Sequence, residues 1–189
     1  MLNIKVATLT SLLLTSFVVF AEQPSNSEDN STQVALDKQW QVGIGTYALV
    51  LEPDDSDYDE DEFTGYNLSL TYGATDNVAI KASYYDTEHD DFSQLELSGC
   101  ELQLLAGTGL ASTGFKIYGS FGFYSESMEY DDIDEDFSGA QLGGGIGYNW
   151  EQVALDFTLS LRTTSDYEDF AEIDDISAAT SSLNIAYRF

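Results

Sequence analysis

The sequence has few basic residues and one cysteine, and each of these two shortages excludes a class of protein. Six Lys and Arg residues stand against 34 Asp and Glu residues in a chain of 189, so the formal net charge is −28. Binding of nucleic acid is therefore not expected, because phosphate recognition needs clustered Lys and Arg. A single cysteine cannot pair within the chain, which excludes a disulfide-stapled fold.

The residues that are abundant favour β structure. The chain holds 12 Tyr, 11 Phe and 15 Gly, and aromatic residues are enriched in strands. Hydrophobic residues make up 43% of the chain and charged residues only 21%, so it is not a disordered acidic tail. The length allows one domain of ordinary size or two very small ones.

The first 21 residues have the pattern of a secretory signal peptide. Lys5 supplies a positive charge, residues 6–20 carry none, and Ala21 ends a small-residue cleavage motif. A membrane-anchoring helix is the alternative, but a spanning helix needs about 20 apolar residues and this run is shorter. We predict a signal peptide over 1–21, a flexible periplasmic tail over 22–38 and one folded domain over 39–189.

From Trp40 onward, apolar and polar residues alternate with the period of two that half-buried strands require. The clearest segment sets Val153 and Leu155 against Ala154 and Asp156. The pattern recurs eight times, over 40–50, 66–72, 78–85, 101–107, 115–124, 140–150, 153–162 and 182–189. We predict an all-β fold, namely an eight-stranded antiparallel transmembrane β-barrel with the strands in up-and-down meander order.

The connections between these segments alternate in length, which bears on whether the barrel is soluble. Those near 74–77, 110–114 and 149–152 are tight, whereas those near 52–63, 86–96, 126–137 and 166–175 are long. Short turns at one rim and long loops at the other are typical of a membrane barrel. A soluble lipocalin-like barrel, with its apolar face inside, is the alternative. Aromatic residues near strand ends are expected to form the interfacial girdles: Trp40, Tyr66, Tyr72, Tyr84, Tyr148 and Trp150.

Charge is segregated in the way that a membrane orientation requires. The four long connections hold 26 of the 34 acids and no Lys or Arg. A Lys or Arg facing lipid at the midplane costs about 2–4 kcal/mol, so the strand residues that carry charge are expected inside. We predict a charge network in the barrel interior, formed by Lys81, Glu101, Lys116, Asp156, Arg162 and Arg188. The alternative is that these are solvated residues on a soluble sheet.

The ending is the most specific part of the sequence, because Leu183, Ile185, Tyr187 and Phe189 alternate to a terminal aromatic residue. Residues 39–189 resemble the small eight-stranded outer-membrane β-barrels of Gram-negative bacteria, of the OmpX/Ail type and the OmpA transmembrane-domain type. The resemblance implies an outer-membrane β-barrel domain among outer membrane lipids. It also implies that the barrel-assembly machinery reads this ending as a signal during insertion, since an open barrel edge in lipid is prohibitively costly. Ail-type adhesins have basic loop patches, from which this sequence departs completely.

Two acidic runs are candidate cation sites. They fit D-x-D-x-D: Asp55, Asp57 and Asp59, and then Asp132, Asp134 and Asp136. Carboxylate oxygens are ligands for Ca²⁺, but an EF-hand is excluded because the glycine at its sixth position and the Glu at its twelfth are missing. A solvated acidic rim is the alternative. We expect diffuse attraction of Ca²⁺ or Mg²⁺ by these loops and no bound cofactor.

Three single residues need an interpretation. His89, the sole histidine, lies among acids with Ser93 nearby, and lipid A palmitoyltransferase and deacylase barrels rely on a histidine with a serine. We expect an ordinary surface histidine instead. Cys100 is expected to be a small apolar strand residue, and the reversed phase before Gly99 predicts a β-bulge there.

Together these features predict a monomeric, non-enzymatic integral protein of the outer membrane. Its expected role is structural or surface-interacting, with acidic extracellular loops that attract cations. A narrow porin-like channel for small solutes is the alternative, and a lipid-modifying enzyme is the third possibility. The large inward side chains, Lys81, Lys116, Tyr118, Arg162 and Arg188, favour a filled lumen over a channel.

Overall fold

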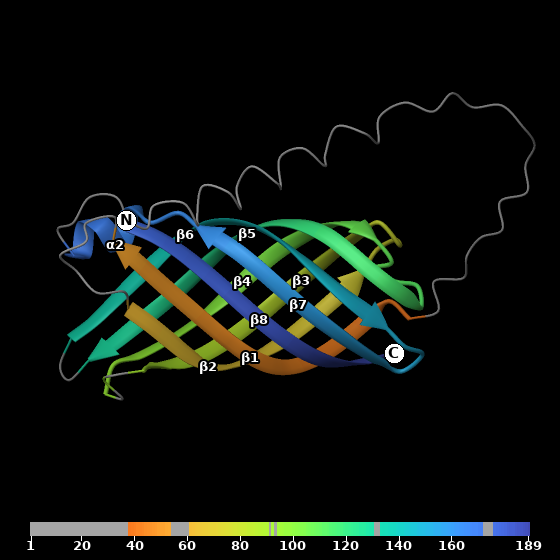
Figure 1. Ribbon diagram of the computed structural model, residues 1–189, viewed down its shortest axis with the longest axis horizontal. Coiled ribbons are helices and arrows are strands. Elements are labelled where there is room, and N and C mark those ends of the chain that lie inside the picture. The colour runs from red at the N-terminus through yellow and green to blue at the C-terminus, as the bar shows by residue number, and fades with distance from the viewer. Residues whose placement is uncertain (1–37, 54–60, 91, 93, 131–132, 172–175) are drawn as a thin grey trace, which may run out of the picture. The chain divides into compact units, whose positions relative to one another are not determined.

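The computed structural model describes residues 38–53, 61–90, 92, 94–130, 133–171 and 176–189. They form a closed barrel in which each of eight strands pairs antiparallel with its sequence neighbours, and β1 pairs with β8 (Figure 1). The elements are β1 Trp40–Pro53, β2 Asp61–Gly73, β3 Val78–His89, β4 Glu96–Thr108, β5 Gly114–Tyr130, β6 Ile133–Asn149, β7 Val153–Arg162, α2 Ser165–Ala171 and β8 Ile176–Arg188. The predicted all-β meander is therefore confirmed. The predicted signal peptide and all but the last residue of the predicted tail lie outside the described residues.

The two ends of the barrel differ. The tight turns between β2 and β3, β4 and β5, and β6 and β7 lie at the end that holds the C-terminus, which we term the turn end (Figure 1). The helix α2 lies at the opposite end, which we term the α2 end. Within the described part of the chain, no helix has the length and apolar character needed to cross a membrane.

The stagger of the strands fixes how wide the lumen is. The shear of the barrel is ten residues. Starting at Gln41 on β1 and moving from each residue to its partner on the next strand, one circuit of the barrel ends at Leu51. An eight-stranded barrel whose strands are tilted by such a shear has an interior that side chains alone can fill. The lumen is therefore a packed interior whose chemistry is set by the inward residues.

Side chains are oriented in the opposite way to a soluble barrel. Leu142 on the outer wall is 67% exposed, whereas Arg188 inside is 0% exposed. The outer wall carries large apolar residues on every strand, among them Val42, Leu68, Ile80, Leu102, Phe121, Ile146, Phe157 and Ile185. This outward apolar belt excludes the lipocalin-like alternative, because a soluble barrel hides its apolar face.

Near the α2 end the polarity of the two faces reverses while the register does not. Leu97 is buried in the lumen there, and the pairing runs without a break through Gly99, which lies opposite Tyr85 on β3 and Glu126 on β5. The β-bulge predicted at Gly99 is therefore wrong. Beyond the apolar belt the outer wall meets water, so apolar side chains turn inward as they do in a soluble protein.

All four predicted long connections contain some regular structure, and in two of them it is extensive. The strands β5 and β6 extend to Tyr130 and from Ile133, so the region 126–137, predicted as a loop, is strand on both sides of residues 131–132. The connection before β8 contains α2, which the alternation pattern did not predict. Glu126, counted among the loop acids, faces the lumen and is buried.

Candidate functional site

A buried arginine organises the lumen near the α2 end. The Nη2 of Arg162, at the end of β7, donates to Tyr47 Oη at 2.6 Å, Tyr85 Oη at 3.0 Å and Glu101 Oε1 at 3.0 Å. Its Nη1 donates to Glu126 Oε2 at 2.7 Å. We term these five residues the Arg162 cluster. Because they come from β1, β3, β4, β5 and β7, the cluster crosses the whole section of the barrel.

Aromatic packing and one glycine fit this cluster into the narrow lumen. The rings of Tyr47 and Tyr85 stack with centroids 4.3 Å apart, and the guanidinium of Arg162 lies 4.1 Å from the centroid of the Tyr124 ring. A Cβ at Gly99 would lie 2.6 Å from Tyr85 Oη, so only glycine leaves room for that phenol. A guanidinium over an aromatic face gains stabilisation from the ring electrons.

The helix α2 brings a further tyrosine into the mouth of the barrel. Tyr167 is buried, packs on Phe137 with ring centroids 4.8 Å apart, and its hydroxyl donates to Glu126. The amide of Ser138 donates to Asp166 at 2.9 Å, which fixes α2 to β6. Apolar residues surround this contact and complete what we term the α2-end cap: Leu49, Phe63, Leu97, Phe137, Tyr167 and Ala178.

A second charged group lies towards the turn end. Asp156 Oδ2 is 2.6 Å from Lys116 Nζ, its Oδ1 is 3.8 Å from Lys81 Nζ, and Tyr118 Oη donates to it at 2.6 Å. We term these four residues the Asp156 cluster. One carboxylate thus lies between two ammonium groups, and the cluster carries one excess positive charge. A Cβ at Gly147 would lie 2.6 Å from Lys116 Cε, so the glycine face of β6 makes space for the lysine.

At the turn end Arg188 donates hydrogen bonds to a backbone segment. Arg188 Nη1 donates to the carbonyl of Trp150 at 2.5 Å, and its Nη2 donates to the carbonyl of Ala111 at 2.6 Å. Leu110 precedes Ala111 and is buried, and Gln41 Nε2 donates to the carbonyl of Leu110 at 3.3 Å. We term Leu110, Ala111 and Arg188 the turn-end cap. These carbonyls stabilise the guanidinium, and Arg188 lies in a different group from the other predicted network residues.

Asp76 holds the β4–β5 turn in place from the neighbouring turn. Its carboxylate accepts hydrogen bonds from the amides of Gly109 at 3.2 Å, Ala111 at 3.4 Å and Ser112 at 3.0 Å. Partial burial opposes ionisation, but these hydrogen bonds, with one from the Ser112 side chain, prevail and hold the pKa of Asp76 below its usual range. The ionised carboxylate therefore belongs to the folded structure of the turn end.

Polar side chains fill the lumen between the two clusters. Thr158 and Ser160 lie on β7 between Asp156 and Arg162 and are buried. Among the described residues, five buried amide side chains have at least one oxygen or nitrogen without a hydrogen-bond partner in the protein, namely Asn149 at the end of β6 and, further along the lumen, Asn67, Gln103, Gln141 and Asn184. Buried amides of this kind are normally satisfied by internal water, so this stretch of lumen is polar enough to hold water.

The structure thus brings the predicted network residues into separate groups. Lys81, Lys116 and Asp156 meet in one cluster, Arg162 meets Glu101 in the other, and Arg188 caps the turn end. Glu126, the tyrosines of the Arg162 cluster and Tyr167 complete these groups, and the sequence analysis did not single them out. For Tyr47 and Tyr85 the sequence did hold a signal, because the alternation places both on the polar faces of their strands and so predicts that they face the lumen.

The acidic residues at the α2 end form rows on the outer wall. Glu88, Glu96 and Glu129 lie directly opposite one another on β3, β4 and β5, and all three are exposed. Of the D-x-D-x-D residues, Asp134 and Asp136 lie on β6, whereas Asp55, Asp57, Asp59 and Asp132 lie outside the described residues. In the part of the chain that the structure describes, no group of three His, Cys, Asp or Glu side chains is arranged to hold a metal ion.

His89 is not the surface residue that the sequence suggested. It is 5% exposed, its Nε2 lies 3.1 Å from Asp61 Oδ1, and its Nδ1 accepts the amide hydrogen of Phe92 at 3.2 Å. Both ring nitrogens are therefore engaged by the protein. Ser93 lies outside the described residues, and Cys100 is exposed on the outer wall.

Comparison with known proteins places this geometry in a family context. The family model described as "Outer membrane protein beta-barrel domain" matches residues 10–189. No curated protein was found with a similar sequence.

Solved structures are similar in fold. Ail, the attachment invasion locus protein of Yersinia pestis, matches with TM-score 0.55 and 17% identity, over 80% of this chain and 99% of Ail. Ail in complex with the heparin analogue sucrose octasulfate matches with TM-score 0.52 and 18% identity, over 80% and 99%. Neisserial surface protein A matches with TM-score 0.55 and 12% identity, over 79% and 97%. At these identities the similarity shows the fold alone.

Proposed function

The chain belongs to the outer membrane protein beta-barrel domain family, and from this premise we propose that it is a structural and surface-interaction protein of a Gram-negative outer membrane. In this proposal residues 1–21 direct the chain to the periplasm. The assembly machinery then reads the ending Leu183, Ile185, Tyr187 and Phe189, which lies on and just after β8, the strand that closes on β1. The turn end faces the periplasm, and the acidic α2 end faces the medium.

The observation that carries this proposal is the Arg162 cluster. Its hydrogen bonds cross the lumen from β7 to β1, β3, β4 and β5. Tyr167 of α2 donates a hydrogen bond to Glu126 of the cluster from the α2 end. The α2-end cap and the turn-end cap add apolar side chains at the two mouths. A solute crossing the barrel would have to displace both caps and break buried charge pairs. This supports a structural role over a channel.

Electrical recordings test this proposal. We expect purified protein in planar bilayers to show no steady, discrete conductance at neutral pH. The matched comparison is a variant that loses the central ion pair of the cluster and the tyrosine of the α2-end cap, Arg162→Ala with Glu126→Ala and Tyr167→Ala. Steady conductance by the unmodified barrel would contradict the structural role and favour the channel.

The outer surface at the α2 end supports a role in contacts mediated by cations. Glu96 lies between Glu88 and Glu129 on adjacent strands, and like charges directly opposite on a sheet destabilise it. Divalent cations relieve such repulsion without a coordinated site, and hard cations favour carboxylate oxygens. We propose that Ca²⁺ or Mg²⁺ gathers diffusely here and links this surface to anionic groups of neighbouring molecules.

The charge of this surface separates the protein from a relative with a known anionic ligand. Ail has been solved with a sulfated heparin analogue, whereas the segments 52–63, 86–96, 126–137 and 166–175 of this chain hold 26 acids, of which Glu126 is buried in the lumen, and no Lys or Arg. A sulfated chain would be repelled by this surface. We therefore propose partners that are cationic or that bind through a shared divalent cation.

One observation favours a second candidate, a narrow channel for small solutes. The amides Asn67, Gln103, Gln141 and Asn184, each with at least one atom that lacks a hydrogen-bond partner in the described part of the protein, make the middle of the lumen polar, as a water-filled path would be. The third candidate, a lipid-modifying enzyme, has less support. A catalytic histidine needs a ring nitrogen that can exchange a proton with a nucleophile, and Phe92 and Asp61 occupy both nitrogens of His89.

A further inference from the structure

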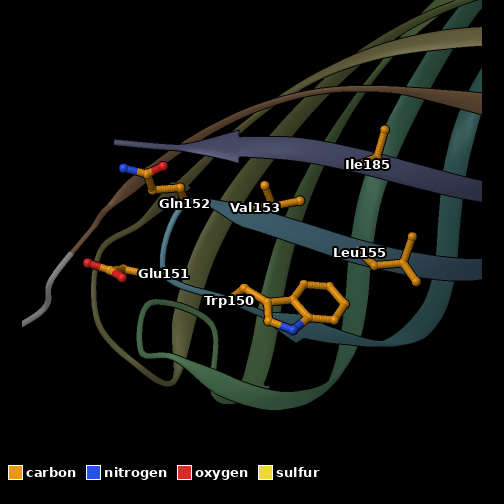
Figure 2. A pocket seen from close by; sticks show the side chains of 6 residues that line it. All are labelled: Trp150, Glu151, Gln152, Val153, Leu155 and Ile185. Carbon is orange, nitrogen blue, oxygen red and sulfur yellow. The ribbon is translucent and has the colours of Figure 1, made fainter.

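Two shallow hollows indent the outer wall near the turn end. The first furrow has a volume of about 710 Å³ and is lined by Trp150, Glu151, Gln152, Val153, Leu155 and Ile185 (Figure 2). The second furrow, of about 360 Å³, lies beside it against Val42, Ile44, Leu68 and Tyr187. Val153 and Ile185 line both furrows. The two furrows are therefore neighbours that share a ridge.

The walls of the furrows are aliphatic and belong to the seam where the barrel closes. Ile185 of β8 pairs with Ile44 of β1 on one side and with Leu155 of β7 on the other. All three are outward-facing and exposed. Since the outer wall of a membrane barrel faces acyl chains, the occupants of these furrows are hydrocarbon tails. Two adjacent furrows with a common ridge match the two tails of one diacyl lipid.

The turn end of the furrows carries groups suited to a lipid headgroup. Among the described residues, Lys38 is the sole basic side chain outside the lumen, and its Nζ lies 5.9 Å from the centroid of the Tyr187 ring. Glu151 and Gln152 are exposed at the edge of the first furrow, where their side chains point away from the Trp150 indole (Figure 2). Aromatic side chains mark the headgroup level of a membrane. A cation thus lies beside Tyr187 of the second furrow, and an anion lies at the edge of the first furrow.

We propose that this seam binds one diacyl phospholipid of the periplasmic leaflet whose headgroup carries both a phosphate and a primary ammonium. The tails lie in the two furrows on either side of the ridge of Val153 and Ile185. Lys38 attracts the phosphate, and Glu151 attracts the ammonium. The inference rests on the outer-membrane location of the barrel and is independent of the proposed surface role.

Fluorescence quenching by brominated lipids tests this proposal, because Trp150 lines the first furrow. The chain has 2 Trp residues, so Trp40→Phe leaves Trp150 as the sole reporter. The protein is placed in nanodiscs of unbrominated phosphatidylcholine to which brominated phosphatidylethanolamine is added at a low mole fraction. We expect quenching above the level that the mole fraction alone produces. Brominated phosphatidylcholine, whose quaternary ammonium has no N–H, and brominated phosphatidylglycerol, which has no ammonium, should quench only in proportion to their mole fractions.

Matched variants locate the site. Val153→Phe fills the ridge between the furrows and should abolish the excess quenching. Leu104→Phe makes a similar change on the exposed outer wall of β4, away from the seam, and should leave it intact. Lys38→Gln removes a half-buried charge, whose Nζ also donates to the carbonyl of Arg188 at 3.2 Å, and should weaken the preference about twofold to fivefold, as expected for a surface ion pair.

The proposal is overturned if the three brominated lipids quench Trp150 equally, or if Leu104→Phe and Val153→Phe act alike. Quenching that instead changes with protein density in the disc would assign the furrows to a second copy of the chain. Either result leaves the conductance test of the filled lumen untouched, so the two proposals fail separately.

Discussion

Arg162 and Glu126 form an ion pair whose two side chains are completely shielded from solvent, with Nη1 and Oε2 2.7 Å apart. Taking two charges out of water is costly, and their attraction repays this only when the remaining donors and acceptors are also satisfied. Here Tyr47, Tyr85 and Glu101 accept hydrogen bonds from Nη2, whereas Nε has no partner among the described residues. The cluster therefore acts as one unit, in which the loss of any charged member leaves the others buried without compensation.

Replacing the cation alone should be severely destabilising. Arg162→Met leaves the carboxylates of Glu101 and Glu126 buried together, and breaking a buried pair in this way costs about 3–5 kcal/mol. The free energy of unfolding of the refolded barrel, measured by urea titration in lipid vesicles, should fall by this amount. The triple variant Arg162→Met, Glu101→Gln, Glu126→Gln should recover most of the loss. If Arg162→Met were as stable as the unmodified protein, Glu101 and Glu126 would not both be ionised in the folded barrel.

Two substitutions at Tyr167 should separate packing from hydrogen bonding in the α2-end cap. Tyr167→Phe keeps the ring on Phe137 but removes the hydroxyl that donates to Glu126, and a hydrogen bond to a charged group contributes about 1.5–3 kcal/mol. Tyr167→Ala also removes the ring, and the loss of a buried aromatic side chain costs about 3–5 kcal/mol. The same urea titration measures both. Equal effects of the two variants would mean that the ring contributes nothing to the cap.

The barrel and the direction of its side chains were predictable because strand alternation has a period of two and lipid imposes a constant apolar outer face. That rule holds from Val153 to Leu161 without exception. It stops above the apolar belt, where Leu97 is inside and Glu96 outside. The hydropathy pattern inverts there while the register continues, and the inversion looks like a bulge in the sequence.

The same inversion explains why part of the site could not be predicted. Glu126 lies in an acidic stretch that predicts a loop. It is two positions after Tyr124 on β5, so the two side chains point to the same face, and both are buried in the lumen. Its partner Arg162 is distant in sequence, and the pairing depends on the stagger of ten positions around the barrel, which alternation does not reveal. The position of Tyr167 depends on α2, whose seven residues are too few to give a helical period.

Neutralising the centre of the acidic row should reduce the response to divalent cations. Glu96→Gln removes the charge between Glu88 and Glu129, so stability at low salt should rise by about 0.2–1 kcal/mol. Millimolar Mg²⁺ should raise the unfolding temperature, measured as the temperature at which the migration of the barrel on a gel changes. The increase should be smaller for this variant than for the unmodified barrel. Glu151→Gln, at the turn end, is the matched control and should leave the Mg²⁺ response unchanged. Identical responses of Glu96→Gln and the unmodified protein would remove this row from cation binding.

Acid should loosen the turn end through Asp76. Hydrogen bonds from Ser112, Gly109 and Ala111 lower the pKa of Asp76 in the folded barrel, whereas in the unfolded chain an Asp titrates near about 3.9. The unfolded state therefore binds the proton more readily, so the stability from this carboxylate is complete above about pH 4 and is lost as the pH falls through the lowered pKa. Thermal unfolding midpoints of the unmodified barrel and Asp76→Asn should differ at pH 6 and converge in stronger acid. Glu151→Gln, in the β6–β7 turn, controls for a general change in charge. A gap between Asp76→Asn and the unmodified barrel that stays constant down to strong acid would show that the folded turn end does not depend on the ionised carboxylate.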